Sequence, residues 1–587
     1  MKSLLKRFGV AWAATVAFLG LLIATSPVSQ AQGGITVSFP ARVAAAPDFA
    51  TEVLGDPWDM CNAQDVSPDP DQLVGFTSFN FLTGPCRAGG TTGPVVVNGA
   101  PAVDSNLAML AQGLYGQAVN PGRNGRNFPI DTAKYQVLSF KVSSSTTEDP
   151  QVYWFHHPSA HPAGLGLGGR VAPRINPGTQ VVVADLTQSL IPGMSPWTDG
   201  VVRGLRLDPN AFNAVQTVFF YWVRLTPSAN SPLAAKQTIS WTGSGPATIT
   251  VRDSGGSVYP IVSNLAANSY LWNYGVLAPG SYTLTVTNSS GSGSRVFSIN
   301  QPPSIEVTDP SPTTGQDFAT TVLGNAWDMS SAADIQITGT DNFNNISFGG
   351  GQLHATNTND DPNVTLLFYT NNSVPIDTSR FRYLTYRLQV DGAYDLGLGS
   401  VARVFWTAQP TMSGFTAAAT LPIIVWPGMN SYTIDLASLS TLSDGGLEPL
   451  NVAEPWTAGP KRHFRFDPHE FGQARTFHID DIKLTAKPMG ASTFVIRFLG
   501  ADGDGDAATV SLYYDTDTNA ANGKTLIVSG VPQATGQYVW NTTAVALGDY
   551  YIYAESSDGI QTIGRYSTVP VQLSRVPSTP GGFRIVP

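Results

Sequence analysis

Short runs of β-branched and aromatic residues, each bounded by Gly, Pro, Asn or Asp, recur along the whole chain. Examples are QVLSFKV from Gln136, TVFFYWVRL from Thr217, SYTLTV from Ser281, TFHIDDIKL from Thr476 and ATVSLYY from Ala508. Runs of this length and composition, separated by turn residues, are typical of β-strands. We find no convincing amphipathic helix, and the segment 104–112 offers one or two turns at most. The pattern therefore predicts an all-β protein.

One segment of the sequence occurs twice in nearly identical form. DFATEVLGDPWDM begins at Asp48, and DFATTVLGNAWDM begins at Asp317. The repeat continues in the same order, because the segments from Phe128 and Pro196 return from Val374 and Pro455. A weaker echo relates YLWNYGVLAPGSYTLTV, from Tyr270, to YVWNTTAVALGDYYIYA, from Tyr538. These two scales of repetition indicate that a unit of one large and one small domain was duplicated.

Composition narrows the class of protein. Charged residues make up only 13% of the 587 residues, whereas Gly numbers 58 and Pro 43. Such a chain is typical of extracellular β-sheet modules joined by turns. The net charge of −10 has no basic counter-block, so the electrostatic footprint of a nucleic-acid-binding protein is missing.

The N-terminal end reads as a secretory signal peptide. A basic start, an apolar run over 9–24 and small residues before Ala31 form this pattern, which predicts a mature protein that begins near Gln32. The alternative is an uncleaved membrane anchor. Export to an oxidising compartment predicts a disulfide between Cys61 and Cys86, the two cysteines of the chain, the alternative being two buried thiols.

The segment FRFDPHEFGQARTFHIDDIKLT, from Phe464, carries a family likeness. It resembles the last part of galactose-binding-domain-like jelly rolls, the β-sandwich of many carbohydrate-binding modules, where a closing strand of the form F-x-I-D-D-I-x-L is common. The likeness extends to both large domains. The small domains resemble fibronectin type III or bacterial immunoglobulin-like domains. The resemblance implies a secreted, non-catalytic protein that binds carbohydrate or mediates adhesion, outside the cell or at its surface.

On this basis we expect an all-β multidomain tandem array of two jelly-roll β-sandwiches and two immunoglobulin-like β-sandwiches. The expected segments are a signal peptide at 1–31, jelly rolls at 48–230 and 317–487, immunoglobulin-like domains at 236–302 and 490–575, and a loose tail at 576–587.

Structural calcium is a further expectation from the resemblance. Such modules often hold the ion between an early acidic residue and an Asp on the closing strand, which implies Asp317 with Asp480 or Asp481 in the second copy. In the first copy Tyr221 and Trp222 stand where that Asp pair stands, which puts calcium there in doubt. The alternative for the Asp pair is a role in hydrogen bonds at the strand end.

A second acidic group lies in the last domain. Asp502, Asp504 and Asp506 alternate with glycine, and this spacing of acidic residues is typical of the start of a calcium-binding loop. The bidentate Glu of a full EF-hand loop is absent, because Tyr513 occupies its position. The alternative is an acidic, solvated turn between strands.

Sugar binding requires flat rings with polar groups beside them. The ligand-side candidates are Trp154, His156, Trp406 and Trp426. His157 and His161 lie close to His156, but adjacent imidazoles on a strand point to opposite faces, which disfavours a shared metal. Trp58 and Trp327, inside the repeated segment, are expected in the core.

The motif search predicts no catalytic activity. The sequence contains no nucleophile elbow, zinc-protease helix or phosphate loop. Asp208 and Asp467, each before a Pro, are expected to set turns and to pair with Arg206 and Arg465. The favoured partner is an extracellular polysaccharide, with no nucleic acid and no membrane insertion after signal cleavage. The alternatives are a matrix or fibre subunit that binds itself or other surface proteins and, more weakly, a glycan-active enzyme.

Overall fold

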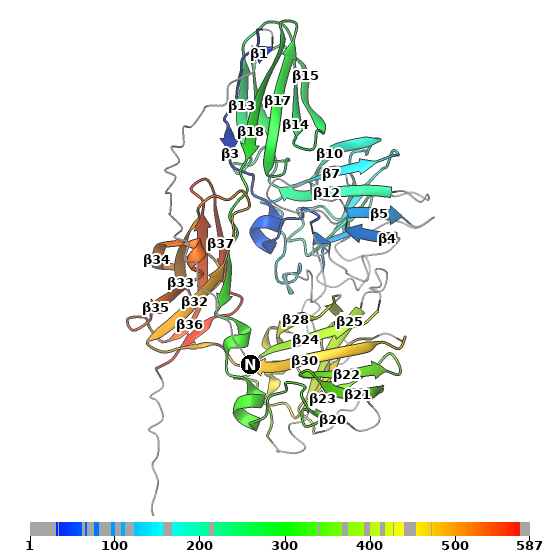
Figure 1. The fold of residues 1–587 in the computed structure, drawn as a ribbon, viewed down its shortest axis with the longest axis vertical. Helices are drawn as coiled ribbons and strands as arrows, with labels where there is room; N and C mark the ends of the chain where they lie inside the picture. Colours follow the sequence, from blue (N-terminus) through cyan, green and yellow to red (C-terminus); the bar gives the residue numbers. More distant parts are fainter. Residues whose placement is uncertain are drawn as a thin grey trace, which may run out of the picture.

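The computed structural model describes most of the chain. The described residues are 31–32, 34–61, 65–66, 76–81, 95–99, 107–111, 122–156, 167–188, 190–209, 217–337, 341–366, 374–392, 400–410, 417–426, 428–439, 454–470 and 472–575. They form an all-β array of four β-sandwich units, each built around its own hydrophobic core (Figure 1). Among these residues no helix is long and apolar enough to cross a bilayer.

The first jelly roll packs two antiparallel sheets, ordered β10-β7-β12-β5-β4 and β6-β11-β8-β9. Its elements are the short π-helix η1 (Ala50–Leu54) and the strands β4 (Phe76–Phe81), β5 (Val95–Gly99), β6 (Leu107–Leu110), β7 (Val137–Ser144), β8 (Gln151–Phe155), β9 (Leu167–Val171), β10 (Gly178–Asp185), β11 (Gly204–Asp208) and β12 (Thr217–Thr226). β8 and the first half of β12 alternate between buried and more exposed residues, as half-buried strands do, whereas all four residues of β6 are buried.

The second jelly roll repeats this strand order. Its five-stranded sheet runs β28-β24-β30-β22-β21, and the facing six-stranded sheet runs β20-β23-β29-β25-β26 with β27 also on β25. The elements are η3 (Pro312–Thr314), η4 (Ala319–Leu323), β20 (Ile335–Gln336), β21 (Phe343–Gly349), β22 (Gln352–Asn357), β23 (Val364–Leu366), β24 (Tyr383–Val390), β25 (Ser400–Thr407), β26 (Ala418–Ala419), β27 (Ile423–Val425), β28 (Asn430–Asp435), η5 (Leu436–Ser438), η7 (Trp456–Ala458), β29 (His463–Asp467) and β30 (Thr476–Thr485). The repeated sequence segments therefore occupy equivalent strands.

The first immunoglobulin-like domain is built from two separate parts of the chain. Its strands are β1 (Ala31–Gln32), β2 (Val37–Ser38), β3 (Arg42–Val43), β13 (Lys236–Trp241), β14 (Ala247–Asp253), β15 (Val258–Leu265), β16 (Ser269–Asn273), β17 (Gly280–Asn288) and β18 (Gly291–Ile299). β2 pairs with β13, and β3 pairs in parallel with β18. The first jelly roll is therefore inserted between the early strands of this domain and the rest of it.

The second immunoglobulin-like domain has the same construction. Its elements are β19 (Glu306–Asp309), β31 (Met489–Gly490), β32 (Thr493–Leu499), β33 (Thr509–Asp515), β34 (Thr525–Pro532), η8 (Gln533–Thr535), β35 (Gln537–Asn541), β36 (Gly548–Ser557), β37 (Thr562–Tyr566) and β38 (Val571–Leu573). β19 precedes the second jelly roll in sequence but pairs with β32, which follows it. The expected domain segments did not include these early strands.

Polar contacts join the four units. Arg565 of the second immunoglobulin-like domain donates to the carbonyls of Thr51 (2.6 Å) and Val53 (2.9 Å) in η1 of the first jelly roll. Arg126 donates to the carbonyl of Ser438, which links the two jelly rolls. The array is therefore held by specific side chains as well as by the connecting chain.

Candidate functional site

The repeated segment that begins at Asp48 and at Asp317 forms the same set of hydrogen bonds in both jelly rolls. One carboxylate oxygen of Asp48 accepts hydrogen bonds from the backbone and hydroxyl of Thr51, and the other accepts from a backbone N–H of β12. Asp317 binds the backbone and hydroxyl of Thr320 and the backbone N–H of Leu484 in the same way. The Asp thus fixes the π-helix to the closing strand, which explains why the segment occurs twice.

The carboxylates expected to share calcium have separate partners. Asp317 bridges to the last residue of β30. Asp480 pairs with Arg387, and Asp481 lies 2.9 Å from Nζ of Lys483. Asp481 is four residues from the end of β30, about 13 Å along the strand. The three carboxylates do not converge on one point in the structure. Calcium binding at this position stays a prediction.

The tryptophans expected to meet sugar are core residues, which corrects that prediction. The side chains of Trp154 and Trp406 are 0% exposed, and Trp426 is 3% exposed. Trp154 packs edge-on against Trp197, and Trp406 packs edge-on against Trp456, with centroid distances of 5.3 and 5.5 Å. The inward face of each strand carries these rings, so solvent and ligand do not reach them. Trp58 and Trp327 are also buried, as expected.

His156 is the fourth predicted ligand residue. Its Nδ1 lies 3.0 Å from the carbonyl of Val201 and its Nε2 lies 2.9 Å from the carbonyl of Pro196. Both ring nitrogens are thus engaged with loop backbone. His157 and His161 lie outside the described residues, as does Cys86, so the Cys61 disulfide stays a prediction.

The acidic loop of the second immunoglobulin-like domain binds an arginine of the first immunoglobulin-like domain. Ligand atoms of Asp502, Asp504 and Asp506 lie within 4.8 Å of one another. The guanidinium of Arg42 contacts Asp504 at 2.8 Å and also Asp506, and the backbone N–H of Gln301 donates to Asp504. We call this contact the Arg42 clasp. Calcium at this loop stays a prediction, and an ion there would compete with the guanidinium for carboxylate oxygens of Asp504 and Asp506.

Two carboxyl groups of this loop have pKa values shifted in opposite directions. Burial, together with the hydrogen bond to Asp504, raises the pKa of Asp502 to about 6. Burial opposes ionisation of Asp504 as well, but hydrogen bonds from Asp502 and Gln301 and the charge of Arg42 lower its pKa overall. Asp504 therefore carries a negative charge that holds Arg42 together with the contact from Asp506.

The Arg42 clasp should be sensitive to salt and acid. Because the pKa of Asp504 is lowered on folding, its contribution is complete above the ordinary Asp pKa of about 3.9 and is lost as the pH falls through the lowered value. At pH 7 we expect R42A to cost about 1 kcal/mol or less, since the pair is partly exposed. Calorimetry at low and high salt checks this result. R174A, which removes an exposed ion pair within the first jelly roll, is the control. An equal loss for R42A at both salt concentrations would contradict an electrostatic clasp.

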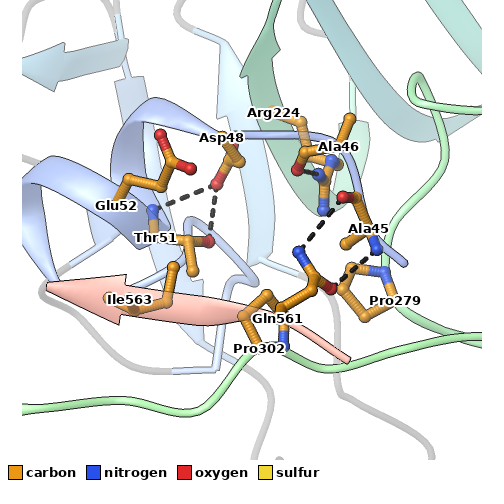
Figure 2. A pocket seen from close by; sticks show the side chains of 10 residues that line it. All are labelled: Ala45, Ala46, Asp48, Thr51, Glu52, Arg224, Pro279, Pro302, Gln561 and Ile563. Atoms are coloured by element: carbon orange, nitrogen blue, oxygen red, sulfur yellow. Dashed lines mark hydrogen bonds between the residues drawn. The ribbon is translucent and has the colours of Figure 1, made fainter. Parts of the chain in front are cut away.

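A cavity that the described residues form between the units is too small for a ligand. It is lined by side chains from the first jelly roll, the two immunoglobulin-like domains and the segments that join them, and Figure 2 shows how they converge. Gln561 binds both the N–H and the carbonyl of Ala45 across it, and Arg224 donates to the carbonyl of Ala46. The volume of about 10 Å³ holds one water. This place is a junction between units rather than a sugar site.

A row of polar side chains crosses the outward face of the five-stranded sheet of the second jelly roll. The strand register sets His354 of β22 opposite His478 of β30, and His478 opposite Gln389 of β24. Nδ1 of His354 lies 2.5 Å from Nδ1 of His478, and Nε2 of His478 lies 2.9 Å from Asp391. Gln389 donates to the other oxygen of Asp391 at 2.8 Å. We call these four residues the histidine row.

The surrounding face carries further hydrogen-bonding groups. Thr356 and Thr476 bind each other 3.3 Å apart, beside the histidine row. Arg387 reaches Asp480 and leaves 48% of its side chain exposed. The face thus presents imidazole, amide, hydroxyl and guanidinium groups whose positions are fixed by their neighbours.

The equivalent face of the first jelly roll is partly covered. Lys141, which the repeat aligns with Arg387, lies 2.7 Å from Asp253 of the first immunoglobulin-like domain, and both side chains are only 12% exposed. The hydroxyl of Ser139 donates to the carbonyl of Val276 in the same contact. Of the two duplicated faces, the one in the second jelly roll is therefore the more accessible in this region.

Comparison with known proteins does not assign a family. The chain matches no protein-family model and no curated protein. Its structural neighbours include a β-1,2-glucanase from Parabacteroides distasonis, at 13% identity and TM-score 0.15, over 40% of this chain and 34% of that one. The chain therefore spans about a third of the glucanase.

Two further neighbours cover more of the chain. The CBM22-1-CBM22-2 tandem domain of Paenibacillus barcinonensis Xyn10C is 9% identical with TM-score 0.18, over 76% of this chain and 99% of that one. The BSP domain of a biofilm associated protein is 10% identical with TM-score 0.11, over 88% and 68%. These scores are too low to identify a family or a ligand. The class that the fold itself defines is an all-β, multidomain array of β-sandwiches.

Proposed function

We propose that the protein is a non-catalytic, extracellular polysaccharide-binding protein and that it binds through the outward face of the sheet β28-β24-β30-β22-β21. The observation that carries the proposal is the difference between the two copies. Arg387 is 48% exposed, whereas Lys141 at the aligned position is 12% exposed against a neighbouring domain.

The chemistry of this face suits hydroxyl groups. Imidazole, amide and guanidinium groups donate and accept hydrogen bonds in fixed directions, and strands about 4.8 Å apart repeat them at regular spacing. The described residues of the face offer no exposed aromatic ring. Binding therefore depends on hydrogen bonds to the edges of the sugar rings rather than on stacking, which differs from the mode expected from the sequence.

The carboxylates of this face support a non-catalytic role. Asp480 is neutralised by Arg387, and Asp391 accepts from both His478 and Gln389. A glycosidase needs one carboxyl group that gives up a proton and a second that acts as base or nucleophile. Carboxylates that already hold cationic or amide partners are suited to orienting those partners.

Affinity electrophoresis through gels that contain soluble polysaccharides tests the proposal. We expect one polymer to retard the protein, with R387A weakening retention about tenfold or more, because a hydrogen bond from a charged group contributes about 1.5–3 kcal/mol. R174A, an exposed arginine of the first jelly roll, is the matched control and should migrate like the wild type. Free migration through a broad panel, or equal retention of R387A, would contradict the proposed face.

A structural role is the second candidate. It is favoured by the contacts that hold the units to one another, such as the Arg42 clasp and the hydrogen bonds of Arg565 to η1. A fixed arrangement suits a matrix or fibre subunit. Sedimentation velocity over a range of protein concentrations distinguishes the two, because a subunit that assembles sediments faster as its concentration rises.

A further inference from the structure

The structure assigns a binding site for one divalent transition-metal cation to His354 and His478, with the two Nδ1 atoms as ligands. This site goes beyond polysaccharide binding and does not depend on it. It rests on the positions of four polar groups on neighbouring strands and on the tautomers that those positions impose.

Acceptors fix which nitrogen of each ring carries hydrogen. Nε2 of His354 lies 3.1 Å from the carbonyl of Gly349, which can only accept, so this nitrogen donates. Nε2 of His478 lies 2.9 Å from Asp391 and donates to its carboxylate. In neutral rings both Nδ1 atoms therefore carry lone pairs.

These lone pairs point at each other across 2.5 Å. Two lone pairs at this distance repel, and this repulsion is removed either by a hydrogen shared between the two nitrogens or by a metal ion bound between them. Zinc holds nitrogen ligands at roughly 2.0–2.1 Å, which places two of them roughly 3.3 Å apart in a tetrahedral site. The rings would have to separate by less than about 1 Å, which a small rotation of these partly buried side chains on the sheet face would provide.

The groups around the rings match those of known metal sites. A histidine that binds metal usually donates its other N–H to a carboxylate or a backbone carbonyl, and here one ring has each kind of acceptor. Imidazole ligands favour copper, nickel and zinc over calcium or magnesium. With two protein ligands, a tetrahedral ion would take its remaining ligands from water.

The first jelly roll provides an internal comparison. Phe219 aligns with His478 in the repeat, and the residue paired with Phe219 on β5 is Val96, where His354 pairs with His478. Neither residue can bind a metal ion. The site therefore belongs to the second copy alone, and we expect one ion per chain.

Isothermal titration of the metal-stripped full chain with zinc chloride tests the assignment. We expect one zinc ion per chain, with H354Q and H478Q each weakening binding at least tenfold. D391N, which keeps both ligands, should weaken it about 10- to 100-fold. H156Q is the control and should bind like the wild type, because both nitrogens of His156 are engaged with backbone.

A spectroscopic readout separates this site from others. With one equivalent of copper, electron paramagnetic resonance should show coupling to two imidazole nitrogens in the wild type and to one in H354Q. The assignment would be overturned if the wild type did not bind zinc at millimolar concentration. It would also be overturned if H354Q and H478Q bound zinc as tightly as the wild type. Loss of binding in D504N instead would place the ion at the acidic loop. Polysaccharide retention measured with chelator present is independent of these outcomes, so the two proposals can fail separately.

Discussion

W406A should unfold the second jelly roll more easily rather than remove a ligand contact. The ring is fully buried, packs edge-on against Trp456 and donates from its indole N–H to the carbonyl of Glu454. Truncating a buried Trp typically costs about 3–5 kcal/mol. For a domain of this size the loss corresponds to a fall in Tm of roughly 6–20 °C. Calorimetry of the full chain measures it.

The first copy supplies the control for this prediction. W154A removes the aligned ring and should shift the transition of the first jelly roll while leaving that of the second in place. If W406A kept its Tm but lost polysaccharide retention, the ring would be a ligand residue after all and the assigned core would be wrong.

R465M should also destabilise the second jelly roll strongly. Arg465 binds both oxygens of Asp467 at 2.6 Å, and Asp467 is only 1% exposed. Removing one partner of a buried ion pair leaves an uncompensated charge and typically costs about 3–5 kcal/mol. The double variant R465M/D467N should recover part of this loss, because it removes the charge. Urea unfolding of the two variants measures both values.

The loss caused by R465M should depend on pH. Burial raises the pKa of Asp467 to about 7 although Arg465 opposes the shift. The folded state therefore keeps the proton where the unfolded chain has lost it, and this group lowers the free energy of unfolding as the pH rises from about 4 to about 7. Without Arg465 the pKa rises further, so the variant should lose more stability at pH 8 than at pH 5. A loss that is equal at both values would show that Asp467 is not the cause.

Local pattern was sufficient to predict the strands and the duplication. Alternation of buried and exposed residues is a property of each strand alone. The repeated segments from Asp48 and Asp317 form the same hydrogen bonds to the closing strand in each copy. The pairing of Arg206 with Asp208 and of Arg465 with Asp467 was also predictable, although these residues lie on strands rather than in turns. Neighbours two residues apart on a strand face the same way.

Features that depend on distant pairing were not predictable. β2 and β19 are very short, and their partners lie about two hundred residues away, so nothing local marks them. Periodicity showed that Trp154 and Trp406 share a face with other strand residues but not that this face points inward. The sequence displayed the acidic loop but not Arg42, which reaches it from another domain. His354 and His478 meet only because β22 and β30 are neighbours in one register.

The insertion of each jelly roll has a mechanical consequence. When the array is pulled by its ends, tension enters the first immunoglobulin-like domain near β1 and leaves it after β18, and these strands are paired with each other. While β2 and β3 stay paired with β13 and β18, the inserted jelly roll lies outside the path of the force. The same holds for the second unit while β19 stays on β32. A stretched array would therefore keep the histidine row undistorted, with the immunoglobulin-like domains bearing the load.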